Sequence, residues 1–310
     1  VFLVDHVFNQ ECMIRVALSV EQTEDSGSFM IKVNSNGPCL FLEGSRTTIF
    51  EFKNYPKISI ITPTYKTELR YLKITVDSVL EQSYGNWEWC IVDDGSNDPA
   101  LNEYLKSLKD DRIKLLLNKK NGGIVSATND ALKLATGDYV AFLDHDDVLD
   151  PDALLYIAIE LDKYPKTDLV YTDEDKVLDD GRFVGPFYKP DFNYSLFLSY
   201  MYTCDFSVYR KIIVDNIWGL RAGFDGAQDY DLALRFIEQT KAIRHVPRIL
   251  YHWRITPTST SSSIMNKPDA RINGARALGG HLERTGIKGK VVAGNFPGHY
   301  DVRYTLPVVK

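Results

Sequence analysis

The chain has 310 residues, of which 44% are hydrophobic and 25% charged, and this composition is typical of a globular protein with one large domain or two smaller ones. The formal net charge of −6 argues against general nucleic-acid binding, because affinity for a phosphate backbone comes from clustered Lys and Arg. No apolar run approaches the roughly 20 residues that span a bilayer, and the four cysteines lack CxxC spacing, which favours reduced thiols of a cytoplasmic protein.

Residues 1–56 are predicted to form a small β-rich module. Short β-prone runs such as "MIRVALSV" and "TTIFEFK" are separated by Gly, Ser, Asn and Asp, which is the pattern of a small antiparallel sheet. The chain starts at Val1 without a methionine and stops just after "RYTLPVVK". We therefore expect it to be part of a longer, modular polypeptide.

From Lys57 the pattern changes to alternating strands and helices. The predicted strands are "KISIITP", "WEWCIVDDGS", "RIKLLLN", "DYVAFLD" and "DLVYTDE". The helices between them are "ELRYLKITVDSVLEQ", "DPALNEYLKSL", "GGIVSATNDALKLA" and "PDALLYIAIELDK", the last with its proline at the beginning, where a missing N–H is harmless. This alternation predicts an α/β fold with a mostly parallel sheet and helices on both faces.

Residues 180–265 are less regular and rich in aromatic side chains. They contain one clear helix, "QDYDLALRFIEQ", one strand, "RILYHWR", and a polar segment at 256–263 that we expect to be a loop able to close over a ligand. We treat 57–265 as one domain divided near residue 150. Residues 266–310 are predicted to be a final helix and an extended linker leading to a further domain.

Polar motifs follow three of the predicted strands: "TPTY", "DDGSND" and "DHDD". In a doubly wound sheet these motifs meet at the carboxyl ends of the strands, where ligands bind. Each motif alone is weak evidence, and "DDGS" by itself is more often a turn followed by a helix cap. Their appearance together and in this order is much more specific for a ligand site.

The acidic segment from Asp144 to Asp150 is predicted to bind a metal ion. Asp144 and Asp146 are two residues apart on an extended segment and project alike, so they can share one cation. Carboxylate oxygens suit Mg²⁺ or Mn²⁺, with water and substrate phosphates as the remaining ligands. The alternative is a solvated acidic loop. We expect Asp150 to cap the following helix and leave Asp147 unassigned.

The order "ISIITPTY … WEWCIVDDGSND … NGGIVSATNDALKLATGDYVAFLDHDDVLDPDAL" resembles the nucleotide-sugar-binding half of the family 2 glycosyltransferases with the GT-A fold. The later "VYTDEDKV", "FYKPDFN", "GAQDYDLALR" and "LYHWR" are similar to members that build bacterial surface polysaccharides such as O-antigen and capsule. The resemblance implies inverting transfer of a sugar from a UDP- or dTDP-sugar to a glycan or lipid-linked acceptor. It also implies a cytoplasmic protein, and leaves open a position at the cytoplasmic face of the membrane.

The resemblance assigns roles to individual residues. The nucleotide-sugar donor would be bound by Pro63, Thr64, Tyr65, Asp93, Asp94, Asn121, Gly122, Asp144 and His145. Asp144, Asp146 and His252 would hold Mn²⁺ or Mg²⁺. Asp229 of "QDYD" would be the catalytic base, and Trp218 is our first choice among the aromatic residues for stacking on the acceptor sugar.

The chain departs from the family pattern at two positions. Thr128 stands where an arginine that faces the diphosphate is common, which leaves neutralisation to the metal and to Lys66, Arg70 or Arg254. Gln228 stands where a glutamate usually precedes the base, which removes one charge but keeps the base.

Several alternatives stay open at this point. Asp229 could be only a charge favourable to a helix N-terminus, Asp231 competes with it, and His252 could be a structural histidine. The segment "TDEDK" is either an acidic turn or a rim facing the acceptor. For the whole chain, the alternatives are a phosphohydrolase of the haloacid-dehalogenase type, whose DxD motif should close the first strand rather than the fourth, and a non-catalytic carbohydrate-binding module.

Overall fold

The computed structural model describes residues 52–255 and 268–305, together with the backbone of six strands between residues 2 and 50. In that first part β1 (Phe2–Phe8) pairs with β2 (Cys12–Leu18), and a second sheet has the order β3 (Val20–Gln22), β4 (Phe29–Ile31), β5 (Cys39–Glu43) and β6 (Arg46–Phe50). All of these pairings are antiparallel, as the sequence predicts for this segment.

One half of the central nine-stranded sheet is parallel. Its strands β7 (Ile58–Thr64), β8 (Trp87–Asp93), β9 (Ile113–Leu117) and β10 (Tyr139–Phe142) lie in the order β10-β7-β8-β9. They are connected by α1 (Leu69–Leu80), α2 (Pro99–Ser107) and α3 (Ile124–Leu134). This half agrees with the predicted alternation of strands and helices, and it brings the three polar motifs to one edge.

The other half of the sheet is mixed. Strand β14 (Ser207–Arg210) is antiparallel to both of its neighbours, β10 and β12 (Leu169–Val177), and β12 is parallel to β15 (Ile243–Arg254). Two short strands, β11 (Val148–Leu149) and β13 (Phe183–Phe187), add to β15 and β12. The helices here are α4 (Ala153–Lys163), α5 (Tyr194–Phe197), α6 (Lys211–Asn216) and α7 (Gln228–Ile237).

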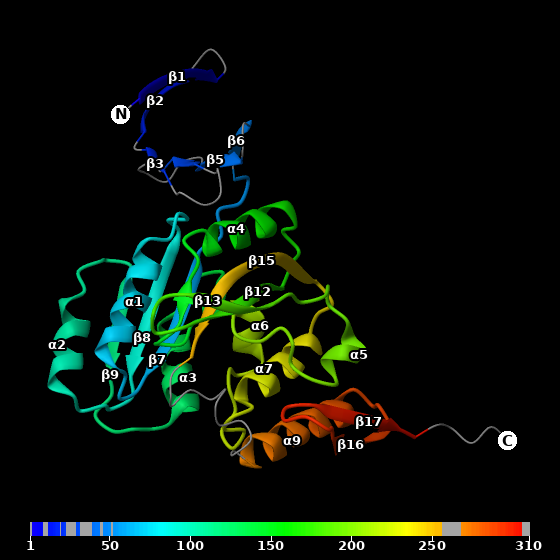
Figure 1. Cartoon of the computed structure of the whole chain (residues 1–310). Helices are drawn as coiled ribbons and strands as arrows, with labels where there is room; N and C mark the ends of the chain where they lie inside the picture. The colour runs from blue at the N-terminus through cyan, green and yellow to red at the C-terminus, as the bar shows by residue number, and fades with distance from the viewer. Residues whose placement is uncertain are drawn as a thin grey trace.

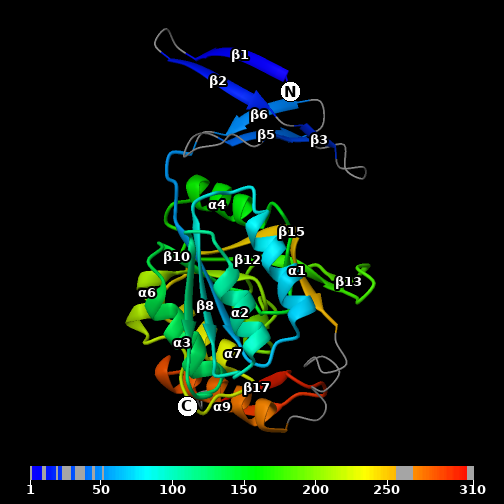
Figure 2. The ribbon, with the colours of Figure 1, turned by 90° about the vertical axis from the view of Figure 1, so that its left-hand side faces the viewer.

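Helices cover both faces of the sheet, as Figures 1 and 2 show. Successive side chains of a strand point to opposite faces, so Ile60 packs with α1, α2 and α4, whereas Ile61 packs with α3 and α7. Strands β7, β8 and β10 are therefore buried on both sides, which explains why they are almost continuously apolar in sequence, whereas the edge strand β9 is only partly buried. None of the helices in the described part of the chain combines the length and the apolar content that crossing a bilayer requires.

The end of the chain differs from the expected extended linker. After α9 (Pro268–Arg284), strands β16 (Gly289–Ala293) and β17 (Tyr300–Tyr304) form an antiparallel hairpin. Tyr300 is buried, stacks on Tyr230 of α7, and its N–H donates to the carbonyl of Ser199. Tertiary contacts thus hold a segment that has no apolar periodicity of its own. The loop predicted at 256–263 lies outside the described residues.

A buried carboxylate joins the strands beneath the parallel half. Glu88 of β8 accepts hydrogen bonds from Ser59 (2.7 Å) and Thr136 (2.8 Å), and it pairs with Lys57 (2.5 Å) and Lys114 (2.8 Å). Burial opposes ionisation of this carboxyl, but these partners outweigh burial and hold its pKa below the usual range. Three parallel strands and the loop before β10 are thereby connected through one ionised side chain.

We predict that Glu88→Gln lowers the free energy of unfolding by about 3 kcal/mol at pH 7. This value is the lower end of the range for removing one partner of a buried ion pair, and we choose it because Lys57 and Lys114 are partly exposed. A carboxyl with a depressed pKa stabilises the fold above its unfolded pKa and loses that contribution as the pH falls toward its folded pKa. The difference between variant and wild type in urea unfolding should therefore shrink below about pH 4. Glu103→Gln, at an exposed position of α2, is the control, and an equal loss in that control would contradict the interpretation.

Candidate functional site

A groove of about 700 Å³ lies at the carboxyl ends of the parallel strands, within the usual size range of small-molecule sites. It is lined by the ends of β7, β8 and β10 and by the first residues of α1 and α3. The predicted donor-binding residues on its wall are Pro63, Thr64, Tyr65, Asp94, Asn121, Asp144 and His145. Asp93 and Gly122, from the same prediction, are not among its lining residues.

Asp93 lies beneath the groove and connects two loops. Its carboxylate accepts from the backbone N–H of Ser96 (3.0 Å), from the Ser96 hydroxyl (2.5 Å) and from the Thr64 hydroxyl (3.2 Å). The same Ser96 hydroxyl accepts from the backbone N–H of Lys66 (2.8 Å). Asp93 thereby ties the loops after β7 and β8 together, and its direct contact with the nucleotide base of a donor stays a prediction.

Asp94 fixes the beginning of α3. Its carboxylate accepts from the backbone N–H groups of Gly122 (2.9 Å) and Gly123 (2.8 Å), so Gly122 contributes to the site through its backbone. Gly95 follows with a φ of +70°, and a Cβ there would lie 2.6 Å from the carbonyl carbon of Lys120. The "DDG" motif therefore needs its glycine both for the left-handed backbone and for the close approach of two loops.

The loop from Asp144 to Asp147 is held from two sides. Asp147 is 1% exposed, and its carboxylate accepts from the hydroxyl of Tyr251 and from the backbone N–H of Arg254 (2.7 Å). The hydroxyl of Thr75 in α1 donates to the Asp147 carbonyl (2.7 Å), and the Arg254 guanidinium donates to the Asp146 carbonyl (2.6 Å). Asp147, unassigned by the sequence, is thus the anchor of this loop. Arg254 is buried under the loop, while Lys66 lines the groove.

With the loop anchored, two carboxylates remain at the groove. Burial and the charges of Asp146 and Asp229 raise the pKa of Asp144 to about 6, although His145 lowers it. The Nδ1 atom of His145 is buried without a hydrogen-bond partner in the described structure, and it lies 3.7 Å from Asp146. Hard oxygen donors without a basic partner fit a divalent cation. Nowhere in residues 52–255 and 270–305 do three His, Cys, Asp or Glu side chains gather closely enough to hold one alone, so substrate and water would supply the other ligands.

His252 is not brought to that pair of carboxylates. It faces Val148 across the β11–β15 pairing, is 7% exposed, and lines neither the groove nor the cavity described below. Its Nδ1 lies 2.6 Å from the carboxylate of Asp175, and its ring stacks on Phe183 with centroids 4.1 Å apart. The bond to Asp175 would not by itself prevent metal binding through Nε2, but His252 does not join Asp144 and Asp146 in a metal-binding cluster in the described part of the chain, which favours the structural alternative.

The acidic run "TDEDK" is neither a turn nor a rim, because it forms part of strand β12. Each of its carboxylates has a basic partner: Asp173 bonds His245 (2.8 Å), Glu174 bonds Lys189 (2.7 Å) and Asp175 bonds His252. Pairing of this kind is what makes burial of three successive acidic side chains tolerable.

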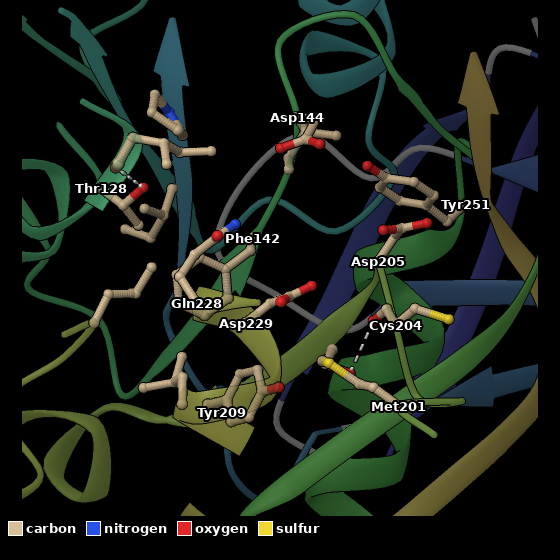
Figure 3. A pocket seen from close by; sticks show the side chains of 17 residues that line it. Thr128, Phe142, Asp144, Met201, Cys204, Asp205, Tyr209, Gln228, Asp229 and Tyr251 are labelled. Atoms are coloured by element: carbon tan, nitrogen blue, oxygen red, sulfur yellow. Dashed lines mark hydrogen bonds between the residues drawn. The ribbon is translucent and has the colours of Figure 1, made fainter. Parts of the chain in front are cut away.

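A second cavity of about 120 Å³ adjoins the groove and shares Pro63, Ile124 and Asp144 with it. Figure 3 shows the carboxylates of Asp144, Asp205 and Asp229 turned toward this space. Asp205 was missed by sequence reasoning. It precedes β14, whose antiparallel pairing with β10 (Ala141 opposite Val208) leads it back to Asp144. Burial and the charges of Glu174 and Asp144 raise its pKa well above the usual value.

Asp229 and Asp231, which the sequence left in competition, lie in different surroundings. Asp229 lines the cavity, and its side chain is exposed to solvent there. Asp231 is fully buried and forms ion pairs with Arg221 and with Arg235 (2.9 Å). Asp231 is therefore structural, and Asp229 is the carboxylate that can meet a ligand. Gln228 also lines the cavity.

Trp218 stands apart from both spaces. It is 88% exposed and has a φ of +65°, which is uncommon for a bulky residue. The Arg235 side chain holds the carbonyls on either side of it, those of Ile217 (2.6 Å) and Gly219 (2.7 Å). Neither cavity includes Trp218 in its lining, so its contact with an acceptor stays a prediction.

The expected helix cap at Asp150 needs correction. Helix α4 begins at Ala153 with Asp152 in the cap position, and the Asp150 carboxylate accepts from the N–H of Asp152 (2.9 Å). Asp150 thus stabilises the turn before the helix. Pro151 lies in that turn and not in the first turn of the helix.

Comparison with known proteins places this site in a family. The model described as "Glycosyl transferase family 2" matches residues 59–218. The chain is 40% identical to the uncharacterized protein y4gI of Sinorhizobium fredii over 253 residues (80% of this chain, 28% of that protein). It is 36% identical to the O-antigen biosynthesis protein RfbC of Myxococcus xanthus over 275 residues (86% and 22%). The chain thus spans about a quarter of the length of these curated relatives.

Among solved structures, S. aureus TarS 1–349 in complex with UDP-GlcNAc is similar, with a TM-score of 0.56, 22% sequence identity and coverage of 73% of each chain. This likeness supports the fold, and the predicted GT-A architecture is confirmed.

We predict that Tyr251→Phe loosens the loop from Asp144 to Asp147, because the buried Asp147 carboxylate loses one of its two donors. The free energy of unfolding should fall by roughly 1–3 kcal/mol, and amide hydrogen exchange of residues 144–147 should accelerate relative to that of β8. Tyr139→Phe also removes a buried hydroxyl, which donates to the Thr167 carbonyl (2.8 Å), and serves as the control. Unchanged exchange in the loop of Tyr251→Phe would show that Asp147 does not anchor it.

Proposed function

The chain belongs to glycosyltransferase family 2, and on that basis we propose that it is a metal-dependent inverting enzyme that transfers a sugar from a UDP- or dTDP-sugar to a glycan or lipid-linked acceptor. One observation carries the proposal: Asp144 lies where the groove meets the cavity, and Asp229 lies across that cavity. A donor that spans the two spaces has its reacting carbon between these carboxylates.

The groove is where we place the nucleotide part of the donor. Thr64 and Tyr65 from the end of β7 and Asn121 from the loop before α3 line opposite walls, and Asp94 holds that loop. A diphosphate that continues toward Asp144 passes Lys66, whose ammonium group supplies positive charge in place of the absent arginine at Thr128.

Asp144 and Asp146 are the residues proposed to hold Mn²⁺ or Mg²⁺. Such an ion, when bound, acts as a Lewis acid that stabilises the charge on the leaving diphosphate. The hydrogen bonds that the Asp147 carboxylate accepts from Tyr251 and Arg254 fix the backbone of this loop. The carboxylates of Asp144 and Asp146 are therefore already positioned when the ligand binds. His252 is left out of this ligand set because it lines neither the groove nor the cavity.

Asp229 is the proposed general base. Its carboxylate accepts the proton of the acceptor hydroxyl while the hydroxyl oxygen forms a bond to the anomeric carbon. The bond between that carbon and the diphosphate oxygen breaks on the opposite side, and the nucleoside diphosphate leaves with the bonding electrons. Attack from the side opposite the leaving group inverts the anomeric configuration.

The two alternatives are less well supported. A haloacid-dehalogenase-type phosphohydrolase would carry its DxD aspartate on the first strand of the fold, whereas Asp144 follows β10, at the end of the parallel half. A non-catalytic carbohydrate-binding module has no need for an unpaired Asp229 in the wall of a cavity or for an anchored pair of metal-binding carboxylates.

The biological context is also part of the proposal. O-antigen biosynthesis by RfbC supports a role in bacterial surface-polysaccharide synthesis. Because the chain matches only 22% of that protein, other parts of a longer polypeptide would contribute to the full activity. Synthesis of this kind would take place in the cytoplasm or at the cytoplasmic face of the membrane, where donor and lipid-linked acceptor meet. Trp218 stays our proposal for stacking on the acceptor.

We predict that Asp229→Asn lowers the rate of sugar transfer by about 10²–10⁴-fold, the usual contribution of a general base. Affinity for UDP in the presence of Mn²⁺ should stay within about twofold of wild type, since the groove is untouched. Transfer is measured by mass spectrometry of the product, and UDP binding by calorimetry. The control is Asp225→Asn, at an exposed aspartate in the loop before α7. Full transfer activity in Asp229→Asn would exclude Asp229 as the base.

A further inference from the structure

The cavity beside Asp144 indicates which class of sugar the enzyme transfers. Asp144 lines both the groove and the cavity, as do Pro63 and Ile124, so the two spaces are continuous at this point. A donor with its nucleotide in the groove and its diphosphate at Asp144 must place its sugar in the cavity. This step rests on the proposed function.

The cavity is lined by acidic side chains and lacks a basic side chain that could pair with an anion. Asp144, Asp205 and Asp229 all line it, and no Lys, Arg or His is among its lining residues in the described part of the chain. The nearby Lys189 is fully buried and donates to Glu174 (2.7 Å) and to the Thr203 carbonyl (3.1 Å), so it is not presented to a ligand.

Asp205 brings a carboxylate without an internal partner to this wall. Across residues 52–255 and 270–305 its carboxylate makes no hydrogen bond and no ion pair, whereas its neighbour Cys204 donates to Glu174. An unpartnered carboxylate beside apolar side chains such as Phe142 and Leu232 suits a ring that has hydroxyl donors on one edge and C–H groups on its face.

A bound metal ion does not remove this negative charge. A divalent cation brings +2, and the diphosphate of the donor brings about −2, so the two compensate each other. The acidic side chains of the cavity then face the sugar without a basic partner, and a carboxylate on that sugar would lie among them with no cation to pair with.

We propose that this chain transfers a neutral or basic sugar and excludes uronic acids, and that Asp205 is a specificity-determining residue that binds ring hydroxyls and offers no pairing partner to a sugar carboxylate. The family alone does not decide this, because the chain is also 33% identical over 211 residues to a chondroitin synthase of Pasteurella multocida. The distinction comes from the charges that line this cavity.

The test compares pairs of nucleotide sugars that differ in one carboxylate. UDP-glucose is compared with UDP-glucuronic acid, and UDP-galactose with UDP-galacturonic acid, by turnover with Mn²⁺ and by competition against bound UDP. We expect the neutral member of the productive pair to have a kcat/KM on the order of 100-fold higher or more, and the uronic member to compete no better than UDP itself. An equal or higher kcat/KM for the uronic member would overturn the inference.

Asp205→Asn tests the assigned residue. The amide is nearly isosteric, so we expect the discrimination to fall about tenfold, mainly through a lower KM for the uronic donor, while UDP affinity is unchanged. The control is Asp191→Asn, at an almost fully exposed carboxylate 3.5 Å from His245, and this change should leave the discrimination between neutral and uronic donors unaltered. Unaltered discrimination in a folded Asp205→Asn protein would remove Asp205 from this role. Failure to bind UDP or to turn over any nucleotide sugar would instead overturn the proposed function itself, and the inference with it.

Discussion

The buried carboxylate of Asp147 is the constraint on which the site depends. It accepts hydrogen bonds from the Tyr251 hydroxyl and the Arg254 backbone N–H, both in β15. The Thr75 hydroxyl of α1 donates to the carbonyl of the same residue. Burial and the neighbouring aspartates raise its pKa well above the usual value, so this residue cannot serve as one more solvated charge. Its bonds fix the backbone of the loop and leave Asp144 and Asp146 at the groove with their oxygens unpaired by Lys or Arg in the described structure.

The two halves of the sheet contribute different parts of the site. The parallel half supplies the groove, with Asp93 and Asp94 tying its loops together. The mixed half supplies the cavity, because antiparallel β14 brings Asp205 back toward Asp144 and α7 presents Asp229. Asp231 of the same helix forms ion pairs with two arginines and is not available to a ligand. Basic residues of this half are used as internal partners: Lys189, His245 and His252 for the acidic run on β12, and Arg221 and Arg235 for Asp231. That use leaves the cavity acidic, and the acidity limits which sugar it accepts.

The parallel half could be predicted from sequence because its apolar strands alternate regularly with amphipathic helices, and its polar motifs lie at strand ends where topology alone brings them together. Asp205, β14 and the final hairpin could not, since short elements such as Ser207–Arg210 owe their conformation to their neighbours rather than to their own pattern. The roles of Asp147 and His252 were likewise hidden, because the sequence shows which residues are acidic or basic but not which of them are paired in the interior. The resemblance to a family identified Asp229, and the burial of Asp231 explains why that choice is physically sensible.

The most direct test of this account is a crystal structure of the chain with UDP and Mn²⁺, with an anomalous difference map recorded for manganese. The account predicts a single manganese peak in the groove, bound by the carboxylates of Asp144 or Asp146 and by the diphosphate, with Asp147 still bonded to Tyr251 and His252 still bonded to Asp175. A manganese ion bound elsewhere, or one that draws His252 away from Asp175 into its ligand set, would contradict it.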